Sequence, residues 1–400
     1  MSRPNRRVLF CVALLLALAA GVAGYLHIQF HGPTGAAARH TDRYLYERDT
    51  VARVGGEKDA VYRYFFATNR SAENPWAPGE GRFGRERDDA VKFGAFDVRI
   101  QKRLGLGLLV DPVRWLQANE MRVRKVETMP RTAAAEAIRA QVAASGSRSL
   151  LIVIPGRGES FPAAIRQTAF VAHVLNIDTP VLVFDWPGDQ GRSFSGHEQA
   201  RSVADASGKA LADVIRLAVE EIAPDRLWLL ADGLGARVAA AAVPALTAVE
   251  SLADADTEFE DVVLAGPDLA PARLAPEVPA GAQALVGKLT VYAATSEQVR
   301  WLTRADGGRR AGGTRGDRPD AAARTSSLDK PGSSARERVA IVNATPEGRK
   351  QASRGISYQT PAFFEDLYLR LAGPDTPDSS RKRPYVTTDG ADLGVRIRHP

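Results

Sequence analysis

The sequence predicts an α/β fold with a mostly parallel, doubly wound sheet, and two observations support this class. Short uncharged apolar segments end in turns rich in proline and glycine, as at residues 150–154 (LLIVI) and 181–184 (VLVF). Each is followed by a segment whose apolar residues recur at helical spacing. Strands that are apolar throughout and alternate with amphipathic helices are typical of a parallel sheet that is covered on both faces.

Two β-prone segments come first in the predicted domain. The expected strands and helices after them alternate along the chain. The predicted strands lie at residues 61–67, 93–100, 150–154, 181–184, 227–230, 262–265, 289–293 and 339–342, and the predicted helices at 162–175, 200–222, 236–245 and 361–371. They belong to one domain, residues 58–372. A polar stretch without apolar periodicity, residues 305–336, predicts a disordered insertion. Residues 31–57 are an expected linker, and 373–400 an expected disordered tail.

The first thirty residues predict a transmembrane anchor. The basic N-terminus, residues 1–7 with three arginines, precedes the uncharged residues 8–30, which are long enough to cross a hydrocarbon core of about 30 Å. Basic residues on that side place the N-terminus in the cytoplasm and the body outside it, on the periplasmic side. A cleaved signal peptide is the alternative, because residues 21–23 are small enough for a cleavage site. Both interpretations export the body.

Composition excludes several classes of function. The net charge is +6, but the arginines are spread along the chain, so no nucleic-acid partner is expected. The single cysteine, Cys11, excludes an intramolecular disulfide and a site built of several cysteines. We expect no cofactor and no metal.

The turn at residues 231–235 (ADGLG) is the strongest candidate for a functional site. It has the spacing of a nucleophile elbow between a buried strand and a helix. Its central residue, which would present the nucleophile, is Gly233. Among six histidines only His399 follows Gly233, where this fold usually places its base. His197, in the loop after the turn at Trp186, is a second functional candidate.

These motifs resemble the bacterial α/β hydrolases of the domain-of-unknown-function family numbered 900, over residues 61–371. The resemblance is carried, in order, by residues 65–70 (FFATNR), 83–84 (FG), 186–187 (WP), 232–235 (DGLG), 266–268 (GPD), 290–292 (TVY) and 355–358 (GISY). It implies an α/β-hydrolase fold with a nucleophile at 233, an acid at 268 and a base at 356. This chain has Gly233, Asp268 and Ile356 there, and Pro155-Gly156 where the family has a histidine-glycine turn.

A dismantled triad predicts a pseudoenzyme. Loss of the serine or the histidine alone lowers turnover about a million-fold. Because Ile356 offers no base, restoring a serine at 233 alone is expected to leave the protein nearly inert. The expected cavity rim, which could hold an apolar or acyl-bearing ligand, consists of Pro155, Gly156, Trp186, Asp232 and Leu234.

Three functions remain open from the sequence. The first is a membrane-anchored pseudoenzyme that acts in binding or assembly at the cell envelope, with a ligand or a protein partner. The second is an active esterase- or lipase-type hydrolase whose nucleophile is Asp232, or whose site is built from Ser193, Ser195 and His197. The third is a structural envelope protein that uses the polar insertion for contact.

Overall fold

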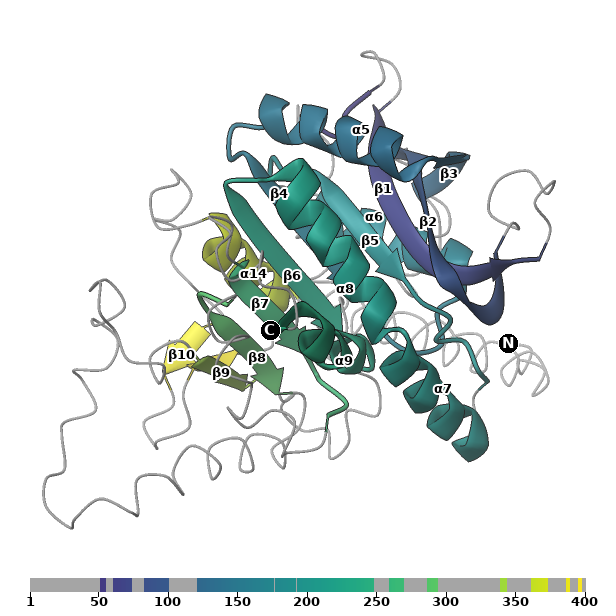
Figure 1. Ribbon diagram of the computed structural model, residues 1–400. Coiled ribbons are helices and arrows are strands. Elements are labelled where there is room, and N and C mark those ends of the chain that lie inside the picture. Colours follow the sequence, from purple (N-terminus) through teal and green to yellow (C-terminus); the bar gives the residue numbers. More distant parts are fainter. Residues whose placement is uncertain are drawn as a thin grey trace, which may run out of the picture.

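One mixed sheet forms the centre of the molecule (Figure 1). The computed structural model describes residues 51–54, 60–73, 83–100, 121–175, 177–191, 193–247, 259–269, 286–293, 339–343, 361–372, 386–388 and 395–397. In this part of the chain eleven strands pair in the order β10-β11-β9-β8-β7-β6-β4-β5-β1-β2-β3. They are β1 (Ala60–Ala72), β2 (Phe83–Ile100), β3 (Met121–Met129), β4 (Ser149–Ile154), β5 (Val181–Asp185), β6 (Arg226–Asp232), β7 (Phe259–Ala265), β8 (Leu289–Ala293), β9 (Val339–Asn343), β10 (Val386–Thr388) and β11 (Val395–Ile397).

The sheet is parallel through its centre and antiparallel at its two edges. Strands β1, β5, β4, β6, β7, β8, β9 and β11 pair in parallel. The meander β1-β2-β3 and the pair β10-β11 are antiparallel. Strand β4 lies between β5 and β6, so the chain crosses over β4 when it passes from β5 to β6. The predicted α/β class with a mostly parallel sheet is confirmed.

Helices cover both faces of the sheet, as the apolar strands require. On one face lie α6 (Phe161–Leu175) and α14 (Pro361–Ala372), and on the other α5 (Arg131–Ala144), α7 (Phe194–Ala206), α8 (Gly208–Arg216) and α9 (Gly235–Thr247) (Figure 1). Successive residues of β4 serve opposite faces. Leu151 and Val153 pack with the first layer, and Leu150 and Ile152 with the second. This alternation explains why β4 is buried along its whole length.

The long helix expected over residues 200–222 is divided in the structure. Helix α7 ends before Ser207, α8 follows, and Leu217–Ile222 forms a π-helical stretch, η3. The Ser207 hydroxyl donates to the carbonyl oxygen of Val203 at 2.8 Å, a side-chain bond that competes with regular helix geometry. Gly208 then lets α8 approach α9, because a Cβ there would lie 2.4 Å from the backbone of Ala241.

Strand β3 and helix α5 were not predicted from the sequence. Strand β3 (MRVRKVETM) carries several charged residues because much of it is exposed, and α5 is rich in alanine, so neither has a marked apolar periodicity. Strands β10 and β11 lie within residues 373–400, for which we expected a disordered tail, and there they extend the sheet.

The expected anchor, linker and insertion, residues 8–30, 31–57 and 305–336, lie outside the described residues, apart from 51–54 of the linker. Within the described part of the chain, no helix combines the length and the apolar character needed to cross a membrane.

Candidate functional site

Four loops meet at the carboxyl ends of the parallel strands. They follow β4, β5, β6 and β7, at residues 155–160, 186–191, 233–234 and 266–269. In open α/β sheets, ligands bind outside the carboxyl ends of the strands, at the point where the winding direction changes. Here that point is the neighbourhood of β4, which the chain crosses between β5 and β6. The candidate site is therefore the turn after β6 together with its three neighbouring loops.

The turn after β6 has the geometry of an elbow without a side chain at its tip. Gly233 has a φ of +50°, in the left-handed region that residues with a Cβ adopt only with strain. Its amide donates to the carbonyl oxygen of Ala265 at 2.9 Å, and its own carbonyl accepts from the amide of Asp268 at 3.0 Å. An ideal Cβ on Gly233 would meet no atom within 4 Å. The position of the missing side chain is thus open space.

A second glycine sets how closely helix α9 approaches the sheet. A Cβ on Gly235 would lie 2.5 Å from the carbonyl oxygen of Ile154 and 2.8 Å from that of Pro155. Any larger residue would push α9 away from the end of β4. The two glycines therefore have different roles: Gly235 permits close packing, whereas Gly233 shapes the turn and leaves a vacancy.

Asp268 brings two basic side chains to this turn. Its Oδ1 accepts a hydrogen bond of 2.8 Å from Nη2 of Arg201, and its Oδ2 lies 3.2 Å from Nε2 of His197. All three side chains are partly exposed, by 29–35 %. Because the backbone of Asp268 is bonded to Gly233, this cluster lies directly beside the elbow. Asp268, which the family resemblance marks as the acid, does contact a histidine. That histidine is His197, not a residue at position 356.

Helix α7 presents this cluster along one of its faces. His197, Arg201 and Asp205 are spaced four residues apart, so they lie on the same side of the helix. Arg201 reaches Asp268, and Asp205 accepts from Nε of Arg237 on α9 at 2.9 Å. The helix begins at a defined point because Ser193 caps it, accepting from the amide of Gly196 at 3.1 Å. Cap and cross-links together fix the position of the helix that carries His197.

Asp232, a half-buried residue at the end of β6, places a carboxyl group next to Gly233. Its Oδ1 is buried and has no hydrogen-bond partner among the described residues. Its Oδ2 lies against the turn after β4, 2.9 Å from where a Cβ on Gly156 would stand. Burial, together with the nearby negative charge of Glu159, raises the pKa of Asp232 to about 7. More of this carboxyl group is therefore protonated near neutral pH than of an ordinary aspartate.

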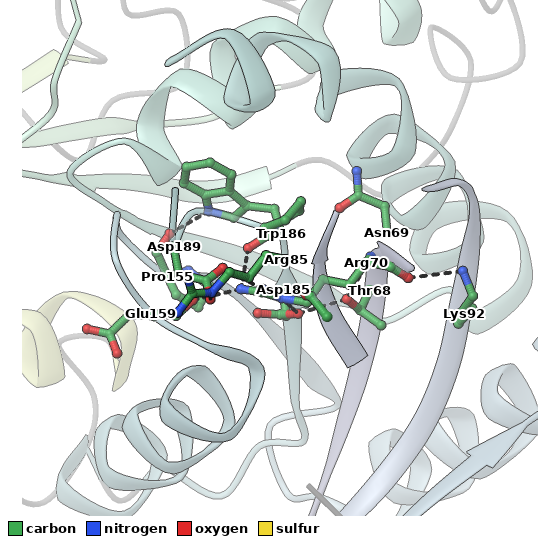
Figure 2. A network of polar contacts seen from close by, with 12 residues as sticks. Thr68, Asn69, Arg70, Arg85, Lys92, Pro155, Glu159, Asp185, Trp186 and Asp189 are labelled. Carbon is green, nitrogen blue, oxygen red and sulfur yellow. Dashed lines mark hydrogen bonds and ion pairs between the residues drawn. The ribbon is translucent and has the colours of Figure 1, made fainter. Parts of the chain in front are cut away.

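Arg70 fixes the loops around the site from the side of strand β1 (Figure 2). Its side chain is only 1 % exposed and uses all five N–H groups. Nε donates to Asp185, Nη1 to Asp189 and the Gly84 carbonyl, and Nη2 to the carbonyls of Glu159 and Trp186, all at 2.7–2.9 Å. Burial opposes the charge of Arg70, but the two aspartates outweigh this effect and raise its pKa.

The neighbours of Arg70 in the sequence complete this arrangement. Thr68 donates to Oδ2 of Asp185 at 2.7 Å, and Asn69 donates to the Ser207 hydroxyl at 3.0 Å, between α7 and α8. Lys92 of β2 donates to the Arg70 carbonyl at 3.0 Å. Residues 68–70 thus connect β1 to the loops after β4 and β5 and to the helix pair on one face, which gives this motif a structural role.

The predicted rim residues occupy two kinds of environment. Trp186 and Leu234 are each 2 % exposed and pack in the core beneath the turns. The indole N–H of Trp186 donates to the Pro155 carbonyl at 2.8 Å, and so joins the loops after β4 and β5. Gly156 and Asp232 face each other across the same edge. Ile356, the resemblance-based position of the base, lies outside the described residues.

The structure separates the members of the predicted loop site. The hydroxyls of Ser193 and Ser195 are bonded to each other at 3.0 Å, and Ser193 also caps α7. Among the described residues neither hydroxyl is hydrogen-bonded to the imidazole of His197. No group of three or more histidine, cysteine, aspartate or glutamate side chains in the described part of the chain could hold a metal ion.

The sheet, the elbow and the acid beside it have the arrangement of an α/β-hydrolase fold. Residues 130–299 match the family model described as "Alpha/beta hydrolase of unknown function (DUF900)", and the resemblance read from the motifs is confirmed over this segment. Neither the curated proteins nor the solved structures include a significant match to the chain.

Sequence reasoning missed Arg201 and the role of Arg70. Arg201 could have been found from the spacing His197-Arg201-Asp205, which places three charged or polar residues on one helix face. Arg70 had only its place in the family motif as a signal, because its five partners come from segments that are 14 to 119 residues away.

The Arg70 network predicts a large loss of stability when the guanidinium is removed. Replacing Arg70 by Met leaves Asp185 buried without its partner, and should lower the free energy of unfolding by about 3–5 kcal/mol. Arg63→Met is the matched control, because Arg63 pairs with Asp97 through two bonds at a partly exposed site. The control should cost about 1 kcal/mol or less. Denaturant titration measures both, and equal losses would contradict the role of Arg70.

The raised pKa of Asp232 predicts that the stability of the folded protein falls as pH rises. Its pKa is about 7 in the folded protein, but about 4 in the unfolded chain. Between these values the folded state holds a proton that the unfolded state has lost, so stability should fall as pH rises, by up to about 1.4 kcal/mol per unit. Asp232→Asn should remove this slope. Unfolding titrations at pH 4.5–7.5 test it, and parallel profiles for the two proteins would refute the assignment.

Proposed function

We propose that this domain is a hydrolase-type scaffold that binds a molecule at its elbow and forms no acyl-enzyme intermediate. The observation that carries the proposal is Gly233, which stands where the turn would present a nucleophile. The glycine offers no atom that could attack a carbonyl carbon, and the space above it is open. Pro155 in the neighbouring turn has no amide N–H that could help to stabilise an oxyanion.

The remaining features of the edge support a binding role. The loops are held by Arg70, Trp186 and the capped helix α7, so the edge is preorganised before a ligand arrives. Preorganisation lowers the entropic cost of binding. The edge also combines apolar support from the core with a few polar groups, which is the usual composition of a ligand site. An apolar or acyl-bearing ligand, or a protein partner, suits this combination.

We further propose where the protein is located in the cell. Residues 8–30 would anchor the protein, and the domain would lie on the periplasmic side, where it would act in binding or assembly at the cell envelope. This part rests on the three arginines before an uncharged segment of spanning length.

A specific observation favours a second candidate, an active hydrolase with a non-standard site. His197 is held beside Asp268, so a histidine and an acid do meet next to the elbow. Asp232 would be the nucleophile in one version of this candidate, and Ser193 or Ser195 in the other. The burial of Asp232 Oδ1 and the capping role of Ser193 favour structural roles for these groups.

Labelling by a fluorophosphonate probe separates the two candidates. The unmodified protein should remain unlabelled, at the level of a heat-denatured sample, because position 233 provides no oxygen nucleophile. Intact-mass measurement after incubation with the probe detects a single adduct. An adduct mapped by peptide sequencing to Ser193, Ser195 or Asp232 would replace the binding proposal by the enzyme candidate.

The proposed topology is tested with reporter fusions after residue 45. A phosphatase that folds only outside the cytoplasm should be active, whereas a fluorescent protein that needs the cytoplasm should be dark. Exchange of Arg3, Arg6 and Arg7 for glutamate should weaken or invert this pattern, because basic residues set the orientation. A bright cytoplasmic reporter on the unmodified segment would rule out export.

A further inference from the structure

Phe194 exposes a large apolar side chain in the first turn of helix α7. Among the described residues, the exposed large apolar side chains are those of Val54 and Phe194, and Phe194 is 81 % exposed. Single apolar side chains are common on protein surfaces, so exposure alone does not indicate a function. The position of Phe194 is more informative, because it lies on the side of α7 that meets the acid beside the elbow.

Phe194 begins a row of residues along one side of this helix. Residues 194, 197, 201 and 205 are three or four positions apart, and such residues lie above one another on a helix. From this side His197 and Arg201 contact Asp268, whose amide is bonded to the carbonyl of Gly233. With a rise of about 1.5 Å per residue, Phe194 lies roughly 10 Å along the helix axis from Arg201. The row is therefore apolar at the start of the helix and polar beside the elbow.

The first turn of α7 fixes the backbone of Phe194. The Ser193 hydroxyl accepts from the amide of Gly196 at 3.1 Å, and the Ser193 carbonyl accepts from the amide of His197 at 3.0 Å. Gly196 packs closely on the loop after β5, because a Cβ there would lie 2.5 Å from the carbonyl oxygen of Gln190. The helix projects past the ends of β5 and β6 (Figure 1). An uncovered ring on a fixed backbone lowers the entropic cost of contact with a ligand.

We propose that Phe194 is a specificity-determining residue of the elbow site, and that it binds the apolar end of an amphiphilic ligand. The polar end of this ligand lies beside the cluster of His197, Arg201 and Asp268. Because the row on α7 changes from apolar to polar over roughly 10 Å, a matching molecule is an acyl chain of medium length with a polar end group. The inference rests on the proposed binding role of the elbow, and it names the chemistry and the orientation of the ligand.

Photo-cross-linking with decanamide tests the contact and the orientation. The amide end both donates and accepts hydrogen bonds, which suits a cluster that contains donors and an acceptor. The full chain is placed in phospholipid nanodiscs with a probe that carries a diazirine at the end of the chain, or with one that carries it next to the amide. Peptide mass spectrometry should locate tail adducts on residues 193–198, and head adducts on residues 231–235 or 266–269. Excess unlabelled decanamide should suppress both.

Substitution of Phe194 should act on the tail of the ligand. Burial of a phenylalanine side chain changes a dissociation constant about 10- to 100-fold. With the probe below saturation, Phe194→Ser should therefore lower the adduct yield about 10-fold, and Phe194→Leu should lower it less. A butanamide probe is too short to reach from the elbow to Phe194, so Phe194→Ser should leave its yield unchanged. A purely structural role of Phe194 would change both yields.

Val54→Ser is the matched control. It removes the other exposed apolar side chain, which lies beside the start of β1 at the opposite end of the parallel strands. The yields of all probes should remain those of the unmodified protein. Thermal melts confirm that each variant is folded.

The outcomes separate this inference from the proposed function. Gly233→Asn places an amide group in the open position, and asparagine tolerates the left-handed backbone better than most residues. Adducts that fall with Gly233→Asn but not with Phe194→Ser overturn the inference and leave the binding role intact. The absence of any suppressible adduct overturns the inference and removes acyl ligands from the proposed function. Labelling of residues 193–198 by a diazirine phospholipid of the disc, unchanged by Gly233→Asn, assigns Phe194 to the membrane surface and also overturns the inference.

Discussion

The buried guanidinium of Arg70 is the interaction on which the geometry of the site depends. A charge that is 99 % removed from solvent is tolerated only when every donor is paired, and here five bonds meet that requirement. Those bonds end on β5, on the loops after β4 and β5, and on Gly84 at the start of β2. The hydrogen bonds that one buried cation requires therefore fix the loops along this edge of the sheet.

The elbow gains its own rigidity from a different source. Gly233 is bonded through its amide to the last residue of β7 and through its carbonyl to the turn after β7, so the elbow keeps its shape although it has no side chain to pack. A glycine at the tip of a turn is usually a source of freedom, because it adopts many conformations. The two backbone bonds remove that freedom and preserve an empty position between ordered groups.

Much of the fold could be predicted from the sequence, because buried strands and amphipathic helices follow simple periodicities. Strands β4, β5, β6 and β8 and helices α6 and α9 lie within a few residues of their predicted bounds. Partly exposed β3 and alanine-rich α5 carry no such signal, and the break at Ser207 depends on a hydroxyl bond within an otherwise regular pattern. Of the site, the glycine at 233 was expected from the spacing of the elbow, and the acid at 268 from the family resemblance. The approach of His197 was not, because it depends on how helix α7 packs across the loops.

The placement of the polar cluster on α7 has a consequence for how this protein can change over evolutionary time. Gly156, His197, Arg201, Asp232, Gly233 and Asp268 all lie within residues 130–299, the segment that matches the family. Among the described residues, the hydrogen bonds and ion pairs of His197, Arg201 and Asp268 involve no residue after 299, so a substitution in β9 or α14 would reach this cluster only through the packing of the sheet. A substitution at Arg70 of the N-terminal meander would act more directly, because Arg70 is bonded to the loops of the site themselves.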